Sequence, residues 1–432
     1  MLKKLLILAA CIILSGCTHA IEPNDLAYIV AVGIDKNEEA QAYDITLQIA
    51  NPQAISGGSD EGGGEGGKKT ITNITVTSSD IFSAVNIANH LYSKDLSLAH
   101  TKLMVFCDEI AREGELKGLS ETIARSEEIR PNTFLTVVKG SAKEYLGSIE
   151  PTNEVNPVKY YEVIYDVDYT GYIPKNQIRN FYAYEQTSER ENVLPLSAVK
   201  KDSGQGSQSS ESSGEGDQKP SDKPLEDKGT QNPYGGFEYL HKDYLAGEIA
   251  VEGDIKTQTC GMAIFREGKM ITECGGVEAL LYNIITGDYV MSEIAYKNDK
   301  TPGEPVTVIQ SQRKKPKVSV DIKGENPRIK VKLYLEADLR TLNEGYVIEM
   351  DIDDFEQQVS AQIKDAAEQF LYKTAREYRS DIVGFGSHIK RHFKTFDEFE
   401  AYGWENIYPD AEFEAEVEFR VRRSGLINKK KD

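Results

Sequence analysis

The chain has 432 residues, and its 70 acidic against 50 basic residues give a formal net charge of -20. Nucleic-acid binders need a basic surface, so a nucleic-acid partner is excluded, and adhesion to an anionic bilayer by charge alone is disfavoured. With 39% hydrophobic residues the chain can form real cores, and its length predicts two or three domains.

The N-terminus has the pattern of a secretory signal peptide. Lys3 and Lys4 precede an apolar run of ten residues, 5–14. That run is too short for a membrane span, which needs about 20 apolar residues, but it is typical of the central part of a signal peptide. Residues 1–16 are therefore predicted to be removed on export, and the mature chain then carries a net charge of -22 because two lysines leave with them.

This segment ends in Leu14-Ser15-Gly16-Cys17, which resembles a bacterial lipobox. Cleavage is predicted between Gly16 and Cys17, and the Cys17 thiol is the one side chain there that can carry a thioether-linked diacylglyceryl group. Residues 17–25 would then form the lipid anchor and its tether, and two acyl chains hold a protein stably at a bilayer. The alternative is an ordinary signal peptide with a chance cysteine.

Strands and helices alternate in residues 26–150, which predicts an N-terminal α/β domain. Strands are expected at 26–34, 43–49, 71–77, 103–106 and 133–138, and helices at about 81–92, 108–113 and 119–125. Ser78, Ser79 and Asp80 offer N-caps for the first helix. The Gly-rich, acidic stretch 56–69 is predicted to be a flexible loop.

Residues 151–255 are assigned to a middle domain. Residues 157–188 are rich in tyrosine, which indicates either packing against the neighbouring domain or a partner surface. Residues 193–199 are predicted to form a strand. No aliphatic or aromatic side chain lies between Val199 and Leu225. The Ser/Gly/Glu-rich stretch 202–235 is therefore predicted to be a disordered insert, because it cannot bury enough surface to offset its ordering entropy.

Residues 256–425 predict a C-terminal α+β domain in which strands precede helices. Strands are expected at 249–265, 270–274, 306–312, 317–322 and 329–339, and helices at 355–378 and 381–393. Asp351, Asp353 and Asp354 are interpreted as the start of the longer helix. Residues 413–421 alternate strictly between apolar and charged, which predicts a strand with one packed face. The predicted fold class is thus α+β or α/β, multi-domain, with mixed sheets flanked by helices and one disordered insert.

The remaining cysteines are too few for a disulfide framework. Cys260 and Cys274 flank a predicted hairpin whose turn is near Glu267-Gly268, where they would lie nearly opposite each other. A cross-strand disulfide is one interpretation, and two small buried thiols are the other.

No motif for catalysis, metal binding or a cofactor stands out. His388 and His392 have the spacing of a zinc-binding helix, but Lys390 and Arg391 between them repel a cation, and a HExxH site needs a glutamate after the first histidine. The basic run 313–317 is interpreted as a solvated turn, with contact to lipid headgroups or an acidic partner as the alternative. The residues therefore predict a protein that binds or scaffolds, without metal or cofactor.

Several separated blocks, in the same order, resemble the Ger(x)C family, the lipoprotein C subunit of bacterial spore germinant receptors. The matching blocks are Asp25-Leu26-Ala27 with Gly33-Ile34-Asp35, residues 100–114, Glu128-Ile129-Arg130-Pro131-Asn132, Gly261-Met262-Ala263-Ile264-Phe265, Ser380-Asp381-Ile382-Val383-Gly384-Phe385-Gly386, Trp404, Tyr408-Pro409-Asp410-Ala411 and Arg423-Ser424-Gly425-Leu426-Ile427. The insert after Lys201 and the Gly-rich loop depart from the family pattern.

The resemblance implies three α/β-type domains and no enzymatic activity. It implies a complex with a membrane-anchored A subunit and a polytopic, transporter-like B subunit at the outer face of the inner spore membrane, and a germination response to small nutrients such as amino acids, sugars or nucleosides. Two other functions compete with it. A substrate-binding lipoprotein of a transporter should show two similar lobes, and an envelope hydrolase should show a catalytic constellation; neither pattern is visible.

Overall fold

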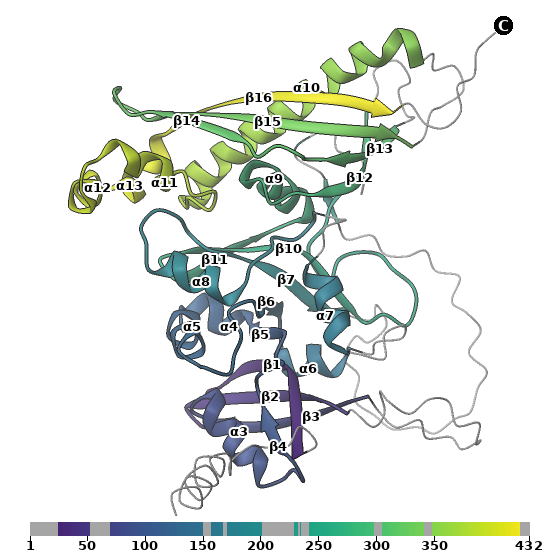
Figure 1. Ribbon diagram of the computed structural model, residues 1–432, viewed down its shortest axis with the longest axis vertical. Coiled ribbons are helices and arrows are strands. Elements are labelled where there is room, and N and C mark those ends of the chain that lie inside the picture. The colour runs from purple at the N-terminus through teal and green to yellow at the C-terminus, as the bar shows by residue number, and fades with distance from the viewer. Residues whose placement is uncertain are drawn as a thin grey trace, which may run out of the picture.

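The computed structural model describes residues 25–51, 70–149, 157–166, 171–200, 229–231, 234, 242–297, 305–340 and 348–423. Two β-sheets, one of nine strands and one of five, lie one above the other with helices between and around them (Figure 1). The predicted signal peptide, Gly16, Cys17, nearly all of the tether and the loop at 56–69 fall outside the described residues. Within the described ranges, no helix is long and apolar enough to cross a membrane.

The nine-stranded sheet is parallel at its centre and antiparallel towards both edges. Its order is β11-β10-β7-β6-β5-β1-β2-β3, and β4 pairs with the start of β1. The strands are β1 Leu26–Asn37, β2 Ala42–Ala50, β3 Ile71–Ser78, β4 Asp95–Ser97, β5 Leu103–Cys107, β6 Phe134–Lys139, β7 Val193–Val199, β10 Thr257–Arg266 and β11 Lys269–Cys274. Every residue of β5 is buried, as expected of a parallel strand covered on both faces.

Helices cover both faces of this sheet. α3 (Ile81–Asn89), α4 (Asp108–Glu113), α5 (Leu116–Ala124) and α8 (Ile178–Glu185) share one core with it, and α6 (Ala142–Gly147) and α7 (Pro157–Tyr165) cover the opposite face. The predicted N-cap of α3 is confirmed, because Asp80 accepts the backbone N–H groups of Phe82 and Ser83, each at 2.9 Å. We call this sheet and its helices the N-terminal half.

The five-stranded sheet forms the C-terminal half together with the helices around it. Its strands are β12 Met291–Tyr296, β13 Val306–Ser311, β14 Lys317–Asp321, β15 Arg328–Leu339 and β16 Glu412–Arg423. β15 pairs with β13 and β14 on one side and, in parallel, with β16 on the other. The alternation predicted for β16 is confirmed, since Phe413, Ala415 and Phe419 are buried while Glu414 and Glu418 are exposed.

α10 (Ile348–Lys373) packs along this sheet and runs into a π-helical turn, Thr374–Tyr378. Short helical segments follow before β16, namely α11 Gly386–Ile389, a 3₁₀ turn Lys390–His392, α12 Phe396–Tyr402, α13 Trp404–Ile407 and a 3₁₀ turn Tyr408–Asp410. The prediction of a single helix over residues 381–393 is therefore wrong for residues 381–385, which precede α11. The buried carboxylate of Asp381 holds the loop before α11 in another shape, which is described below.

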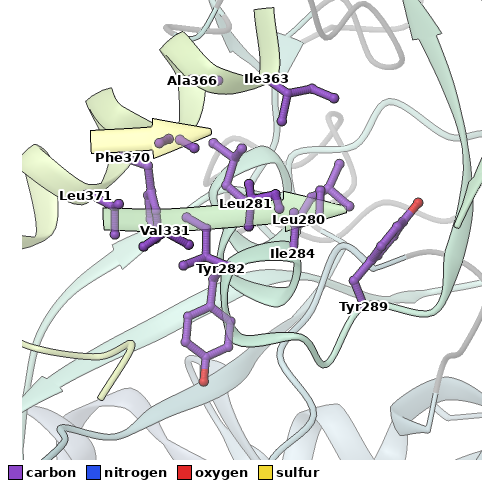
Figure 2. Close-up of a cluster of buried hydrophobic side chains, with 14 of the residues drawn as sticks. Leu280, Leu281, Tyr282, Ile284, Tyr289, Val331, Ile363, Ala366, Phe370 and Leu371 are labelled. Atoms are coloured by element: carbon purple, nitrogen blue, oxygen red, sulfur yellow. The ribbon is translucent and has the colours of Figure 1, made fainter. Parts of the chain in front are cut away.

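α9 (Gly276–Thr286) lies between the two sheets (Figure 1), and every residue from Gly276 to Ile285 is buried. Its core includes Met262 and Ile264 of β10 on one side and the inner faces of β15 and α10 on the other. Figure 2 shows Leu280 and Leu281 gathered with Val331, Phe370 and Leu371, whereas the ring of Tyr282 points away from them. A helix that is apolar all round belongs in a core, and here that core joins both halves.

One charged group enters this core with α9. Glu278 is 1% exposed. Its carboxylate accepts hydrogen bonds from Tyr234 (2.5 Å), Lys373 Nζ (2.6 Å) and Tyr378 (3.0 Å). A buried charge is tolerated when it is paired and hydrogen-bonded in this way. Glu278 therefore links α9, the end of α10 and Tyr234.

The nine-stranded sheet crosses both domain boundaries expected from the sequence, near residues 150 and 255. β7 pairs in parallel with β6, and β10 pairs antiparallel with β7. The expected N-terminal and middle domains therefore share one sheet, and β10 and β11 of the expected C-terminal domain extend it. Periodicity along the chain identifies a strand but does not identify its partner, so the sequence could not show that one sheet takes strands from all three expected domains.

Two further expectations differ from the structure. Residues 229–231 and Tyr234 lie inside the predicted insert 202–235, yet β8 (Thr230–Gln231) pairs with β9 (Lys242–Asp243) and Tyr234 is buried against α9. α10 begins at Ile348, so the three aspartates 351, 353 and 354 lie inside its first turns and do not precede the helix. β4, β12, α6, α9, α12 and α13 were not expected. α9 is buried on all sides, so it lacks the one-sided apolar stripe by which a helix is predicted.

Truncation of Leu281 tests the role of α9 as the shared core. Leu281→Ala should lower the free energy of unfolding by about 2–5 kcal/mol, because it leaves a cavity between two sheets. Leu91→Ala is the matched control, since it removes the same atoms from a side chain that is 72% exposed. Chemical denaturation of both variants gives the comparison, and equal midpoints would contradict the proposed role of α9.

Candidate functional site

A second junction between the halves lies where three loops meet. They are residues 186–192 between α8 and β7, the tip of the β10–β11 hairpin, and the segment from residue 379 to β16. Backbone and side-chain bonds join them directly, since Glu191 N–H donates to Asp381 O (3.0 Å) and Ser380 Oγ donates to Phe265 O (2.7 Å). We call this region the loop junction.

Asp381 organises the C-terminal side of the loop junction. Its carboxylate accepts the backbone N–H groups of Gly384 (2.8 Å), Phe385 (3.1 Å) and Gly386 (2.8 Å) and the indole N–H of Trp404 (2.8 Å). Burial raises the pKa of Asp381, while these four donors act in the opposite direction. The carboxylate thus curls residues 381–386 into a compact loop and attaches α13 to it.

Arg190 enters the same loop from the N-terminal half. Its Nε–H donates to Ile382 O (3.0 Å), and its guanidinium also donates to the hydroxyls of Tyr184 and Tyr282. The guanidinium carbon lies 4.6 Å from the ring centre of Tyr184, which is within the range of a cation–π contact. Arg190 therefore connects α8, α9 and the Asp381 loop through one side chain.

The two glycines of this loop are required by close packing. Gly384 has φ +88°, in the left-handed region, and a Cβ there would lie 2.9 Å from Arg190 Cδ. A Cβ at Gly386 would lie 2.5 Å from Glu189 O and 2.8 Å from Trp404 Cδ1. The Ser380–Gly386 motif is thus explained as the segment that docks one half of the molecule on the other.

A polar pocket of about 280 Å³ opens at the loop junction. Charged side chains of both signs line it, among them Glu191, Arg266, Arg379 and Glu405. Burial raises the pKa of Glu191 to about 7, although the Glu267 N–H donates to both of its carboxylate oxygens at 3.1 Å. Small-ligand pockets are mostly apolar with few polar groups, so this arrangement suits a charged contact between protein segments better than an enclosed substrate site.

Cys260 and Cys274 are free, buried thiols. The register pairs Cys274 with Met262, two residues from Cys260, and the strands shift between Ile264 and Phe265. The two cysteines, expected to lie nearly opposite each other, are therefore offset by two residues. Burial raises the pKa of Cys260 to about 12 and that of Cys274 well above its usual range, so both groups are protonated and unreactive.

The basic run 313–317 forms an exposed turn between β13 and β14, as the solvated-turn interpretation predicts. The Lys314 ammonium lies 5.2 Å from the ring centre of Tyr334, and Arg313 pairs with Glu336 at 3.5 Å. Across the ranges that the structure describes, no cluster of histidine, cysteine or acidic residues is arranged to hold a metal ion.

The described tyrosines of the tyrosine-rich segment are either fully buried or half-buried. Tyr161 and Tyr165 are fully buried under the nine-stranded sheet, and the Tyr165 hydroxyl bonds to those of Tyr145 (2.8 Å) and Ser197 (3.0 Å). For these two residues the packing interpretation is correct, because their polar tips are satisfied inside the protein.

Sequence reasoning missed the residues that join the halves. Glu278 has a signal, since it is the only charged residue in the apolar stretch 276–287 and such a group needs partners. Arg190 and Glu191 have no such signal, because their partners across the junction, Ile382 and Asp381, lie almost two hundred positions away in the sequence.

Comparison with known proteins gives the family. Residues 19–199 match the spore germination protein N-terminal domain, and residues 260–425 match the C-terminal domain described as Spore germination B3/GerAC like. The chain therefore belongs to the GerC family of spore germination proteins, the C-subunit family of germinant receptors.

Three proteins of Bacillus subtilis (strain 168) are similar to this chain in sequence. Spore germination protein KC is 32% identical over 155 residues, 36% of this chain and 38% of that protein, and the putative spore germination protein YfkR is 27% identical over 34% and 37%. These two alignments therefore span little more than a third of each relative. Spore germination protein YndF is 19% identical in an alignment that covers 96% of this chain and 95% of YndF.

A crystal structure of the GerBC protein has a similar fold. The superposition covers 90% of this chain and 96% of the GerBC chain, with a TM-score of 0.50 and 14% sequence identity. Together with the mixed sheets and flanking helices, this agrees with the α+β class expected from the sequence.

Asp381→Asn should open the loop junction locally. An amide cannot accept from all four donors, and a buried donor without a partner costs about 1–3 kcal/mol. Trp404 is the single tryptophan of the chain, so its emission should move to longer wavelength and the unfolding midpoint should fall. Asp410→Asn, at an exposed position nearby, is the control, and identical emission in both variants would show that Asp381 does not hold the loop.

Glu191→Gln should change how stability depends on pH. Because the folded-state pKa of about 7 exceeds the ordinary value of 4.5, folded protein retains a proton that unfolded protein releases. This contribution is complete below pH 4.5 and is lost as pH rises to 7. The variant should therefore lose less stability than wild type over this range, by roughly 2 kcal/mol after screening. Glu252→Gln, at an exposed position, is the control and should follow wild type. If the free energy of unfolding of Glu191→Gln falls with pH as steeply as that of wild type, the prediction is refuted.

Proposed function

We propose that this protein is a lipid-anchored, non-catalytic subunit of a spore germinant receptor and is needed for the germination response to small nutrients. The observation that carries the proposal is the match of the N-terminal and C-terminal family models to successive parts of one chain, 19–199 and 260–425. Both halves of a germinant-receptor C subunit are therefore represented, in order.

Attachment to the membrane is assigned to lipid on Cys17. The Leu14-Ser15-Gly16-Cys17 pattern supports this assignment, and two acyl chains supply a stable anchor where one does not. Eight residues separate the lipid from the first strand, and at about 3.3–3.6 Å per residue they reach roughly 26–29 Å when extended. The N-terminal half would thus stay next to the bilayer, on the outer face of the inner spore membrane.

The proposed partners are the membrane-anchored A subunit and the polytopic B subunit of the receptor. The proximity imposed by the tether supports this assignment, because it leaves the N-terminal half within reach of integral membrane proteins. A non-catalytic role is supported by the loop junction, where buried charged groups bond to backbone and to one another across the two halves. Such groups position segments of the protein.

Germination of spores that carry Cys17→Ala at the native locus, beside a full deletion, tests the proposal. Both strains should lose the response to one class of nutrient while other receptors still act, which is measured by the fall in optical density of a spore suspension. The variant should also leave the membrane fraction, because its acyl anchor is gone.

Cys11→Ala is the matched control. This cysteine lies in the apolar run of the signal peptide, so its substitution should leave both localisation and germination as in wild type. If the deletion leaves every germination response intact, and no other receptor duplicates its role, the proposal is refuted and a transporter's binding lipoprotein becomes the better hypothesis.

A further inference from the structure

Exposed apolar side chains gather on one helix. Eight large apolar residues are exposed among the residues that the structure describes, and three of them lie on α3 or in the turn that follows it. They are Phe82 (37% exposed), Ile87 (43%) and Leu91 (72%), the last being the most exposed of the eight. The opposite face of α3, with Ile81, Ala84, Val85 and Ala88, is buried in the core. The outer side of α3 therefore carries Phe82 and Ile87 together with the uncharged polar residues Ser83 and Asn86.

The same stretch carries no charge. Between Asp80 and Lys94 the sequence contains no Asp, Glu, Lys or Arg, although 28% of the chain is charged. Charged side chains resist transfer out of water, whereas apolar and small polar groups enter a membrane interface readily. In a protein of net charge -20, this surface is one that an anionic membrane does not repel.

The fold also places this surface beside the point where the tether arrives. β4 pairs in parallel with the start of β1, with Leu26 opposite Asp95. Asn89, the last residue of α3, accepts the Leu96 N–H at 2.8 Å, which ties the helix to β4. Three residues separate Leu91 from Asp95, so their Cα atoms are at most about 14 Å apart, and the tether reaches farther than that. α3 and β4 lie at one end of the molecule, with the five-stranded sheet at the other (Figure 1).

We propose that Phe82, Ile87 and Leu91 insert into the lipid bilayer to which Cys17 is anchored, so that α3 seats the N-terminal half on the membrane. This inference rests on the lipid anchor proposed above. The contact is apolar, as in interfacial helices whose apolar side sinks to the boundary of the acyl chains. It therefore does not depend on anionic lipid. Lipid on Cys17 limits how far the protein can move, and α3 determines which side faces the bilayer.

Fluorescence quenching in vesicles tests the insertion. The full-length lipidated protein with Leu91→Trp is purified from membranes and reconstituted into phosphatidylcholine vesicles whose acyl chains are brominated near the headgroup. The introduced indole should be quenched and shifted to shorter wavelength, equally with and without phosphatidylglycerol. Trp404 is buried at the loop junction, so the emission of the protein without Leu91→Trp gives the background to be subtracted.

Val290→Trp is the matched control, because Val290 is 44% exposed and directly precedes β12 of the five-stranded sheet. Its indole should not be quenched. A second variant, Ile87→Asp together with Leu91→Trp, should lose most of the quenching while the protein still floats with the vesicles, because a charge at Ile87 opposes insertion.

The outcomes separate the two proposals. If the protein floats with vesicles but Leu91→Trp is no more quenched than Val290→Trp, the insertion is refuted while the anchor stands; protection of this position only after a membrane protein partner is added would assign the surface to that partner. If the protein does not float, the anchor itself fails, and the insertion fails with it.

Discussion

The burial of α9 between two sheets is the constraint on which the rest of the structure depends. Each sheet presents an apolar face, and α9 fills the space between them with side chains on all sides. It also carries Glu278 into that space, where an unpaired carboxylate would cost several kcal/mol. Lys373, Tyr378 and Tyr234 must therefore converge on it, and this fixes where α10 ends and where the chain returns after the insert.

The loop junction adds a second attachment between the halves. The π-helical turn Thr374–Tyr378 and the left-handed Arg379 turn the chain towards β10, where Asp381 and Arg190 complete the contact. Interfaces between independent domains are usually polar and permit relative motion. Here an apolar core and a network of buried hydrogen bonds act together, so the two halves behave as one body. A binding protein that closes on its ligand needs a hinge between its lobes, and this architecture provides an interface of the opposite kind.

The two ends of this body differ in chemistry. At one end α3 is uncharged and exposes Phe82 and Ile87. At the other, the outer face of the five-stranded sheet carries cross-strand ion pairs such as Lys330–Glu414 and Lys332–Glu416, which are well solvated and contribute little to stability. The proposed insertion of α3 into the bilayer would leave the charged face of the five-stranded sheet in water, which suits a subunit held in one orientation at a membrane.

Local pattern in the sequence was enough to predict many strands and helices of the two halves, because each buries one face and repeats with a period of two or about 3.6 residues. It also predicted the cap at Asp80, the alternation of β16 and the solvated basic turn, and the separated motifs indicated the family. Local pattern did not predict α9, which is buried on all sides and has no such one-sided pattern. Three features depended on tertiary structure alone. β7, β10 and β11 join the first sheet, because hydrogen bonding between strand edges is not encoded in periodicity. Cys260 and Cys274 are offset by a register shift. Glu278, Arg190 and Asp381 become a connected set only when α9 and the loop junction bring together residues that lie up to about two hundred positions apart in the chain.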